Sequence, residues 1–156
     1  MTAEEEELEA LGQRFLSAVE LHAASRLDAA EDELRAILKI EPRLAEPRLL
    51  LGRLLLDTDR LGDAEEHTRT ALADLESGGQ WTDEVPENVV LSVAHAQLAE
   101  ILRRVADEDD VIFGDPERFH AIVADSRAHF SKAAELDPND ETSSYYAFFM
   151  GPPVEN

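Results

Sequence analysis

The feature that most constrains this chain is a spacing of 34 residues that recurs between similar apolar or small residues. The pairs are Ala18 and Gly52, Leu21 and Leu55, Leu27 and Leu61, Ala30 and Ala64, Ile37 and Ala71, and Leu38 and Leu72. Within each period two apolar stripes at helical spacing are separated by a turn. Periods of this length are typical of arrays in which each repeat is one supersecondary unit that stacks on its neighbours. The chain is therefore predicted to be an array of helix pairs.

The residues at these positions resemble those of the tetratricopeptide repeat family. The matching positions are Leu21, Leu27, Ala30, Leu34, Ile37 and Pro42 in the first repeat, and Leu51, Gly52, Leu55, Ala64 and Ala71 in the second. In such helix pairs, small residues at the crossing let two backbones approach, and large aliphatic residues fill the space between pairs. The resemblance implies an all-α fold and a protein-binding function.

A third repeat is present in expanded form. Residues 95–104 match a first helix through Leu98, Ala99 and Leu102, and residues 129–138 match a second helix through Phe130, Ala133, Ala134 and Pro138. Leu51 and Leu98 are 47 residues apart, so 13 residues are added before this repeat. Leu38 and Ala134 are 96 apart, which is two periods plus 28, so 15 more lie inside it. The resemblance covers about residues 11 to 138.

The sequence predicts one all-α domain over residues 1–150, an antiparallel helix-pair solenoid with a C-terminal capping helix. The repeats are expected at about 11–44, 45–78 and 88–138, the cap at 141–150 and a tail at 151–156. Helices are expected at 3–24, 27–40, 45–57, 61–76, 87–106 and 116–136. Thr2 with Glu5 has the pattern of a capping box, and Asp115 followed by Pro116 is a second helix start.

Two segments are predicted to connect helices. Residues 77–88 read as a linker that holds Trp81, the only tryptophan, for which packing on an adjacent helix is favoured over presentation to a partner. Residues 106–119 read as a solvated loop. Its acidic run lacks the central glycine and terminal glutamate of a helix-loop-helix calcium site.

Charge and composition exclude several classes of partner. The chain has 35 acidic and 14 basic residues, a formal charge of −21 that repels phosphate backbones and anionic lipid heads. Nucleic acid is therefore not an expected ligand. The sequence has no apolar run near the roughly 20 residues that span a bilayer, so no direct membrane insertion is expected. With no cysteine to indicate an oxidising compartment, a cytoplasmic location is expected.

No pattern of catalytic or cofactor-binding residues stands out. The chain lacks a cysteine nucleophile, a glycine-rich phosphate loop and paired histidines at metal-binding spacing. Asp125 and His129 lie four residues apart, and a surface charge pair is favoured over a shared metal ion. We therefore expect neither an enzyme nor a resident metal or cofactor.

The family resemblance implies a concave groove lined by the first helix of each pair. Projected onto this sequence, the partner-binding positions are Phe15, Val19, His22, Leu49, Arg53, Leu56, Ala96, Glu100 and Arg103. An apolar floor with isolated bases favours an amphipathic helix or an extended peptide with aliphatic anchors. The alternative is that the apolar members of this set pack only between helices.

These observations favour an adaptor or scaffold that holds a peptide or helix of a partner protein. Two alternatives stay open: an acidic secretion or assembly chaperone with such repeats, and an acidic decoy or inhibitor of a basic protein. Near the C-terminus, Tyr145, Tyr146, Phe148 and Phe149 are candidates for self-association as a homodimer.

Overall fold

The computed structural model describes residues 2–82 and 85–140, and all regular secondary structure in this part of the chain is helical. Its seven helices are α1 (Ala3–Ala23), α2 (Leu27–Ile40), α3 (Ala45–Asp57), α4 (Leu61–Glu76), α5 (Glu87–Ala106), α6 (Asp109–Ile112) and α7 (Pro116–Leu136). The predicted capping helix, the tail and the four C-terminal aromatic residues lie outside the described residues. Within the described ranges, no helix is long and apolar enough to cross a membrane.

The described part of the chain confirms the all-α class, and the six helices predicted between residues 3 and 136 are present with their ends within one residue of those expected. The predicted capping box is also present: the Glu5 amide donates to Oγ1 of Thr2 at 3.1 Å, and the Thr2 amide donates to Oε2 of Glu5 at 2.8 Å. The prediction of a loop at 106–119 was incomplete, because α6 forms inside it. Four residues are too few for a helical period to be visible, and buried Val111 fixes this turn.

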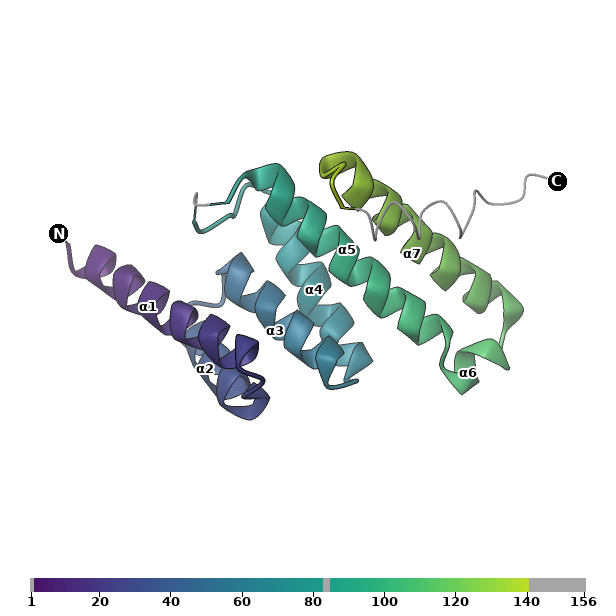
Figure 1. Cartoon of the computed structure of the whole chain (residues 1–156), viewed down its shortest axis with the longest axis horizontal. Coiled ribbons are helices and arrows are strands. Elements are labelled where there is room, and N and C mark those ends of the chain that lie inside the picture. Colours follow the sequence, from purple (N-terminus) through teal and green to yellow (C-terminus); the bar gives the residue numbers. More distant parts are fainter. Residues whose placement is uncertain (1, 83–84, 141–156) are drawn as a thin grey trace.

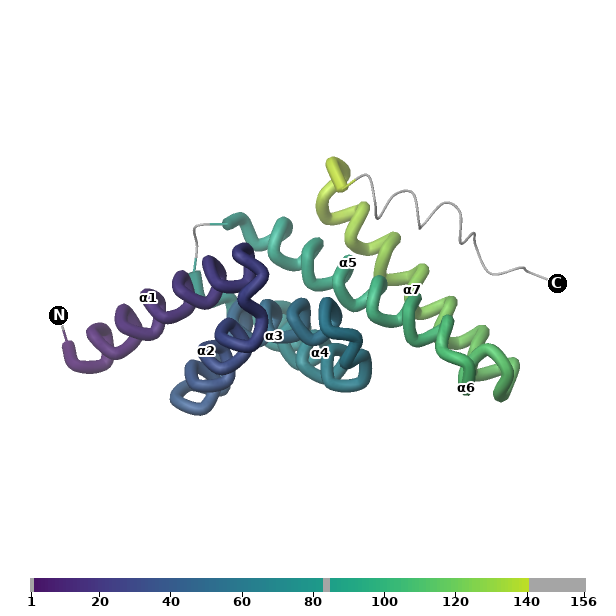
Figure 2. Tube along the Cα trace, turned by 60° about the horizontal axis from the view of Figure 1, so that its bottom comes forward, coloured from purple at the N-terminus to yellow at the C-terminus, as the bar shows by residue number. Residues whose placement is uncertain are grey.

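The helices pack as three neighbouring pairs: α1 with α2, α3 with α4, and α5 with α7. Figure 1 shows the pairs following one another along the molecule, and α6 lies at the turn between α5 and α7. Contacts of α2 with α3 and of α4 with α5 join the pairs. Figure 2, turned by 60°, shows the same succession from another side.

Two buried serines fix the register between α5 and α7. The Ser92 hydroxyl donates to the Ala133 carbonyl at 2.8 Å, and the Ser126 hydroxyl donates to the Ala99 carbonyl at 2.7 Å. Residue numbers rise along α5 as they fall along α7, so the two helices are antiparallel. Because each hydroxyl bonds to a backbone carbonyl across the contact, both serines are satisfied despite their burial.

Small residues occupy corresponding buried positions in the three pairs. Ala18, Gly52 and Ala99 are buried in the first helices. Ala30, Ala64 and Ser126 have no exposed surface in the second helices. Ser126 follows Ala64 by 62 residues, which is one period plus the 28 added residues. The periodic small residues therefore lie in equivalent, closely packed surroundings.

The turns repeat with the same period. Ser25 and Asp59 have left-handed backbones, with φ of 61° and 60°. In each turn the next amide donates to the carbonyl five residues earlier, at 2.9 and 2.8 Å, which closes the helix in a Schellman motif. At the ends of α2 and α7, Glu41 and Asp137 share an extended backbone, with ψ of 92° in both. Each precedes a proline, which disfavours helical conformation at that position.

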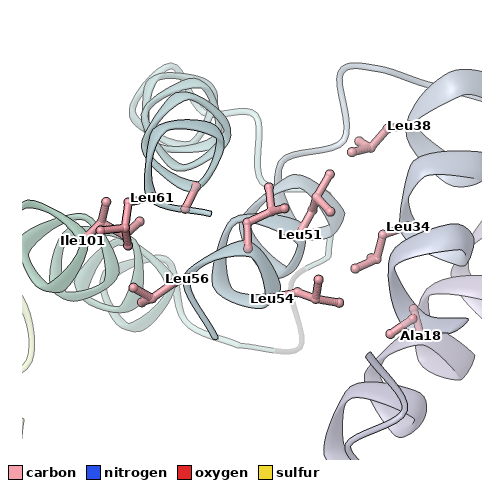
Figure 3. Packing of buried hydrophobic residues seen from close by; sticks show 11 residues of the cluster. Ala18, Leu34, Leu38, Leu51, Leu54, Leu56, Leu61 and Ile101 are labelled. Atoms are coloured by element: carbon pink, nitrogen blue, oxygen red, sulfur yellow. The ribbon is translucent and has the colours of Figure 1, made fainter. Parts of the chain in front are cut away.

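One core cluster joins the first two pairs to the third. In Figure 3, Leu51 and Leu54 of α3 lie toward Leu34 of α2, whereas Leu56 lies toward Ile101 of α5. All five side chains are at most 1% exposed. Helix α3 is therefore buried on two sides, and its remaining side is available to form a surface with α1 and α5.

Candidate functional site

The first helices of the three pairs line one groove. It has a volume of about 670 Å³, and its walls come from α1, α3, α5 and the linker residues Gln80, Trp81, Thr82 and Val85. The apolar lining residues are Phe15, Leu16, Leu49, Leu50, Trp81, Val85, Val90 and Val93. The polar and charged lining residues are Glu9, Gln13, Glu46, Arg53, Gln80, Thr82 and Gln97.

Several apolar side chains in this groove are exposed to solvent. Leu49 and Val90 are buried and form the floor. Leu16 on α1 is 54% exposed, Val93 on α5 is 50% exposed, and Val85 in the linker is also exposed. Contiguous exposed apolar surface of this kind marks binding sites more often than isolated exposed residues do. The groove therefore offers apolar contacts from two helices and a loop.

The linker is held in place by a carboxylate on α3. The Trp81 amide donates to both oxygens of Glu46, at 2.9 and 3.0 Å, and the Thr82 amide donates to Oε2 at 2.8 Å. The side chain of Gln80 donates to the carbonyls of Thr82 and Val85 at 2.6 and 2.7 Å. Glu46 lies in the first turn of α3, where a carboxylate also interacts favourably with the helix dipole.

Trp81 itself packs on α1. Its ring centroid is 6.0 Å from that of Phe15, and a Cβ at Gly12 would lie 3.9 Å from the indole. We expected Trp81 to pack on an adjacent helix; it does pack on a helix, but that helix is α1 of the first repeat, which is distant in sequence. The half-buried ring also lines the groove, so the same residue closes the wall and contacts the space inside.

Glu46→Gln should loosen this end of the groove. The amide retains one oxygen acceptor, but its NH₂ group faces backbone N–H donors that the carboxylate accepted, so hydrogen bonds to the linker are lost. Trp81 is then expected to become more exposed, with an emission maximum at longer wavelength. Steady-state fluorescence measures this, because the chain has no other tryptophan. Glu65→Gln on α4 is the control and should leave the spectrum unchanged; an unchanged Glu46→Gln spectrum would contradict the clamp.

The structure brings three of the nine projected groove residues together: Phe15, Leu49 and Arg53 line the groove. Val19 is exposed one turn further along α1. Leu56 is 1% exposed within the core, and Ala96 is half-buried on α5. Neither Leu56 nor Ala96 lines the groove.

The polar and charged members of the projected set have hydrogen-bond or ion-pair partners within the chain. His22 Nε2 lies 2.9 Å from Oδ2 of Asp57, whose other oxygen accepts from Nε of Arg53 at 3.1 Å. Glu100 accepts from Nη2 of Arg103 at 2.8 Å and also from Arg104. Burial is the largest influence on Glu100, but these arginines more than offset it and lower its pKa. His22, Glu100 and Arg103 lie outside the groove lining.

The groove is displaced by about one helical turn toward the N-termini of its helices, relative to the projected stripe. Two of its rows are Gly12, Glu46 and Val93, and Leu16, Leu50 and Gln97, which keep the spacings of 34 and 47. The linker closes the groove at this end. Extending the repeat alignment by one turn finds these helical residues, but no sequence signal places Trp81 beside α1.

A buried polar network lies beneath the groove floor. Nε2 of Gln97 donates to the Leu49 carbonyl and to Oγ1 of Thr68, both at 2.9 Å. These contacts join α5 to α3 and α4. Gly52 leaves the space for them, because a Cβ there would overlap the Thr68 hydroxyl and lie 2.9 Å from Nε2 of Gln97.

Nε2 of His129 lies 3.2 Å from Oδ1 of Asp125, a contact that is an ion pair only when the imidazole is protonated. The other carboxylate oxygen accepts from Nη2 of Arg69 at 2.8 Å. Among the described residues, no group of three or more metal-ligating side chains is arranged to hold an ion.

The sequence matches no protein-family model and no curated protein.

Proposed function

We propose that this chain is a tetratricopeptide-like helix-pair solenoid that acts as an adaptor, and that its groove holds a segment of a partner protein. The observation that carries the proposal is the exposed apolar lining contributed by three successive first helices. The repeated turns and the buried small residues support the solenoid assignment. A cytoplasmic setting is part of the same proposal.

Some apolar residues of the projected groove set pack only between helices, as the alternative interpretation expected. Leu49 and Leu56 are buried, so charged substitutions there would test folding and not binding. Leu16 and Val93 lie in the groove with about half of their surface exposed. They are the positions at which binding can be tested without loss of the core.

Leu16→Glu and Val93→Glu should each weaken the binding of groove ligands at least about tenfold, which corresponds to ~1.4 kcal/mol. At either position a carboxylate replaces an apolar contact with the ligand and loses hydration when the groove is occupied. Because both positions are exposed, unfolding free energies should change by less than about 0.5 kcal/mol. Peptides selected from a random display library on the parent chain provide the ligands, and their affinities for each variant are measured.

The matched control is Ile40→Glu, because Ile40 is 49% exposed on α2 and lies outside the groove. This variant should bind the selected peptides as the parent does. An equal loss of peptide affinity in all three variants would indicate a general effect of the added negative charge and not a contact in the groove. Failure of the parent to select any peptide, or full binding by Leu16→Glu, would overturn the proposed function.

Salt separates the adaptor from an acidic decoy. Exposed charges are screened over about 8 Å at physiological ionic strength, and more strongly at 0.5 M salt. Binding through apolar anchors should persist at 0.5 M salt and depend on Leu16. Binding that disappears at 0.5 M salt and is insensitive to Leu16→Glu would favour the decoy.

A further inference from the structure

Most of the polar groups that line the groove already have partners within the chain. The Gln97 amide donates to the Leu49 carbonyl and to Thr68, as described above. The Gln80 amide donates to two linker carbonyls, and the Glu46 carboxylate accepts three backbone hydrogen bonds. An occupant that reaches the floor therefore finds apolar contacts and few free hydrogen-bonding groups.

This arrangement disfavours an extended peptide. The helical walls use their own backbone groups internally, and the described chain has no strand edge to which a peptide could add. An extended occupant would leave its amides and carbonyls without partners in an apolar groove, at about 1–3 kcal/mol for each group. A helix satisfies its own backbone and presents only side chains to the groove.

The charges around the groove favour a basic occupant. Glu9 lines the groove on α1, is exposed, and has no ion-pair partner among the described residues. Arg53, the one cation among the described residues of the lining, is paired with Asp57 at 3.1 Å. The exposed acidic residues at positions 4–7 continue the negative charge along α1. A ligand with Lys or Arg beside α1 would complement this wall.

We propose that the occupant is an amphipathic helix of a partner protein, with its apolar face in the groove and Lys or Arg on the flank that lies beside α1. This inference rests on the proposed function of the groove and specifies the chemistry of its ligand. Charge argues against occupation by a second copy, since each chain carries −21. It also disfavours residues 141–156, which include two glutamates and no Lys or Arg.

Three blocked, tryptophan-free 18-residue peptides test this inference with the full chain. The first is a Leu/Lys amphipathic helix. The second has the same Leu positions with Glu in place of Lys. The third is the Leu/Lys peptide with a central proline, which breaks the helix. Binding is followed by Trp81 emission, because this single tryptophan lines the groove.

The Leu/Lys helix is expected to bind at least about tenfold more tightly than either other peptide. Glu9→Gln should weaken its binding about two- to fivefold, as for one exposed ion pair. Glu117→Gln changes the net charge equally at an exposed position outside the groove, and should have less effect. Leu16→Ser, which removes an anchor without adding charge, should also weaken binding.

Each contrary result has its own meaning. Equal binding of the Leu/Glu helix, or equal effects of Glu9→Gln and Glu117→Gln, would overturn the basic ligand and leave the groove as a binding site. Equal binding of the proline peptide would overturn the helical ligand. If the Leu/Lys helix binds and Leu16→Ser has no effect, the peptide lies elsewhere and this inference fails. The proposed function fails separately if library peptides also ignore Leu16.

Discussion

The Gly52→Ala variant is expected to lose about 2 kcal/mol of unfolding free energy, although alanine is the better helix former. Removing a mid-helix glycine alone gains about 1 kcal/mol. Here the new Cβ would overlap the Thr68 hydroxyl and crowd Nε2 of Gln97, both of which are buried. Overpacking costs about 1–3 kcal/mol, and loss of the buried hydrogen bonds costs a similar amount.

Urea unfolding followed by circular dichroism measures this change. Gly62→Ala is the matched control, since a Cβ at Gly62 meets nothing within 4 Å, and it should gain up to about 1 kcal/mol. Thr68→Ala removes the obstructing hydroxyl, so the double variant Gly52→Ala with Thr68→Ala should be more stable than the sum of the single changes predicts. A stabilised Gly52→Ala variant would contradict the close approach of α3 and α4.

The second large effect is a loss of stability in mild acid that arises at His95. Its Nδ1 lies 2.8 Å from Nδ1 of His129, and the two rings are stacked. The Asp125 carboxylate accepts from Nε2 of His129, so neutral His129 presents Nδ1 as an acceptor and His95 donates to it. A second proton on this pair would remove the acceptor and the hydrogen bond.

Burial and the neighbouring His129 and Lys132 lower the pKa of His95 from 6.5 to about 4. Burial also lowers the pKa of His129, against the opposing influence of Asp125. Because the unfolded chain binds protons first, this stabilisation is complete above pH 6.5 and is lost as the pH falls toward 4. The shift at His95 corresponds to roughly 3 kcal/mol in total.

The measurement is the unfolding free energy by urea between pH 7 and 4.5, for the parent and for His95→Asn. The asparagine amide can still donate to His129 but does not titrate, so the variant should lose less stability as the pH falls. The hydrogen bond from Arg60 lowers the pKa of Glu31 to about 2, so the stabilisation from this carboxylate is complete above pH 4.5 and is lost only below that pH. Identical pH slopes for parent and variant would contradict the assignment to His95.

Much of the fold follows from local sequence signals. The 34-residue period, the helix caps and the two prolines after Glu41 and Asp137 can all be read from the sequence. They predict the ends of the six long helices within one residue. Helix α6 is different, because its four residues depend on the burial of Val111 and not on a periodic pattern.

The groove could be predicted only in part, because its position depends on contacts between distant residues. The projection selected the correct helices and included Phe15, Leu49 and Arg53. It could not place Trp81, since the clamp from Glu46 spans 35 residues and brings the linker to α1. The linker closes the groove near the N-termini of its helices. The projected positions nearer the C-termini are instead occupied by ion pairs.

The most direct test of the account is to map where the Leu/Lys helix binds, by recording amide ¹H–¹⁵N correlation spectra of the labelled full chain with and without the peptide. We predict that the largest shifts fall in residues 9–16, 46–53, 80–82 and 90–97, which form the walls of the groove. Shifts concentrated in α2, α4 or α7, with the groove residues unchanged, would contradict the assignment of this groove as the binding site.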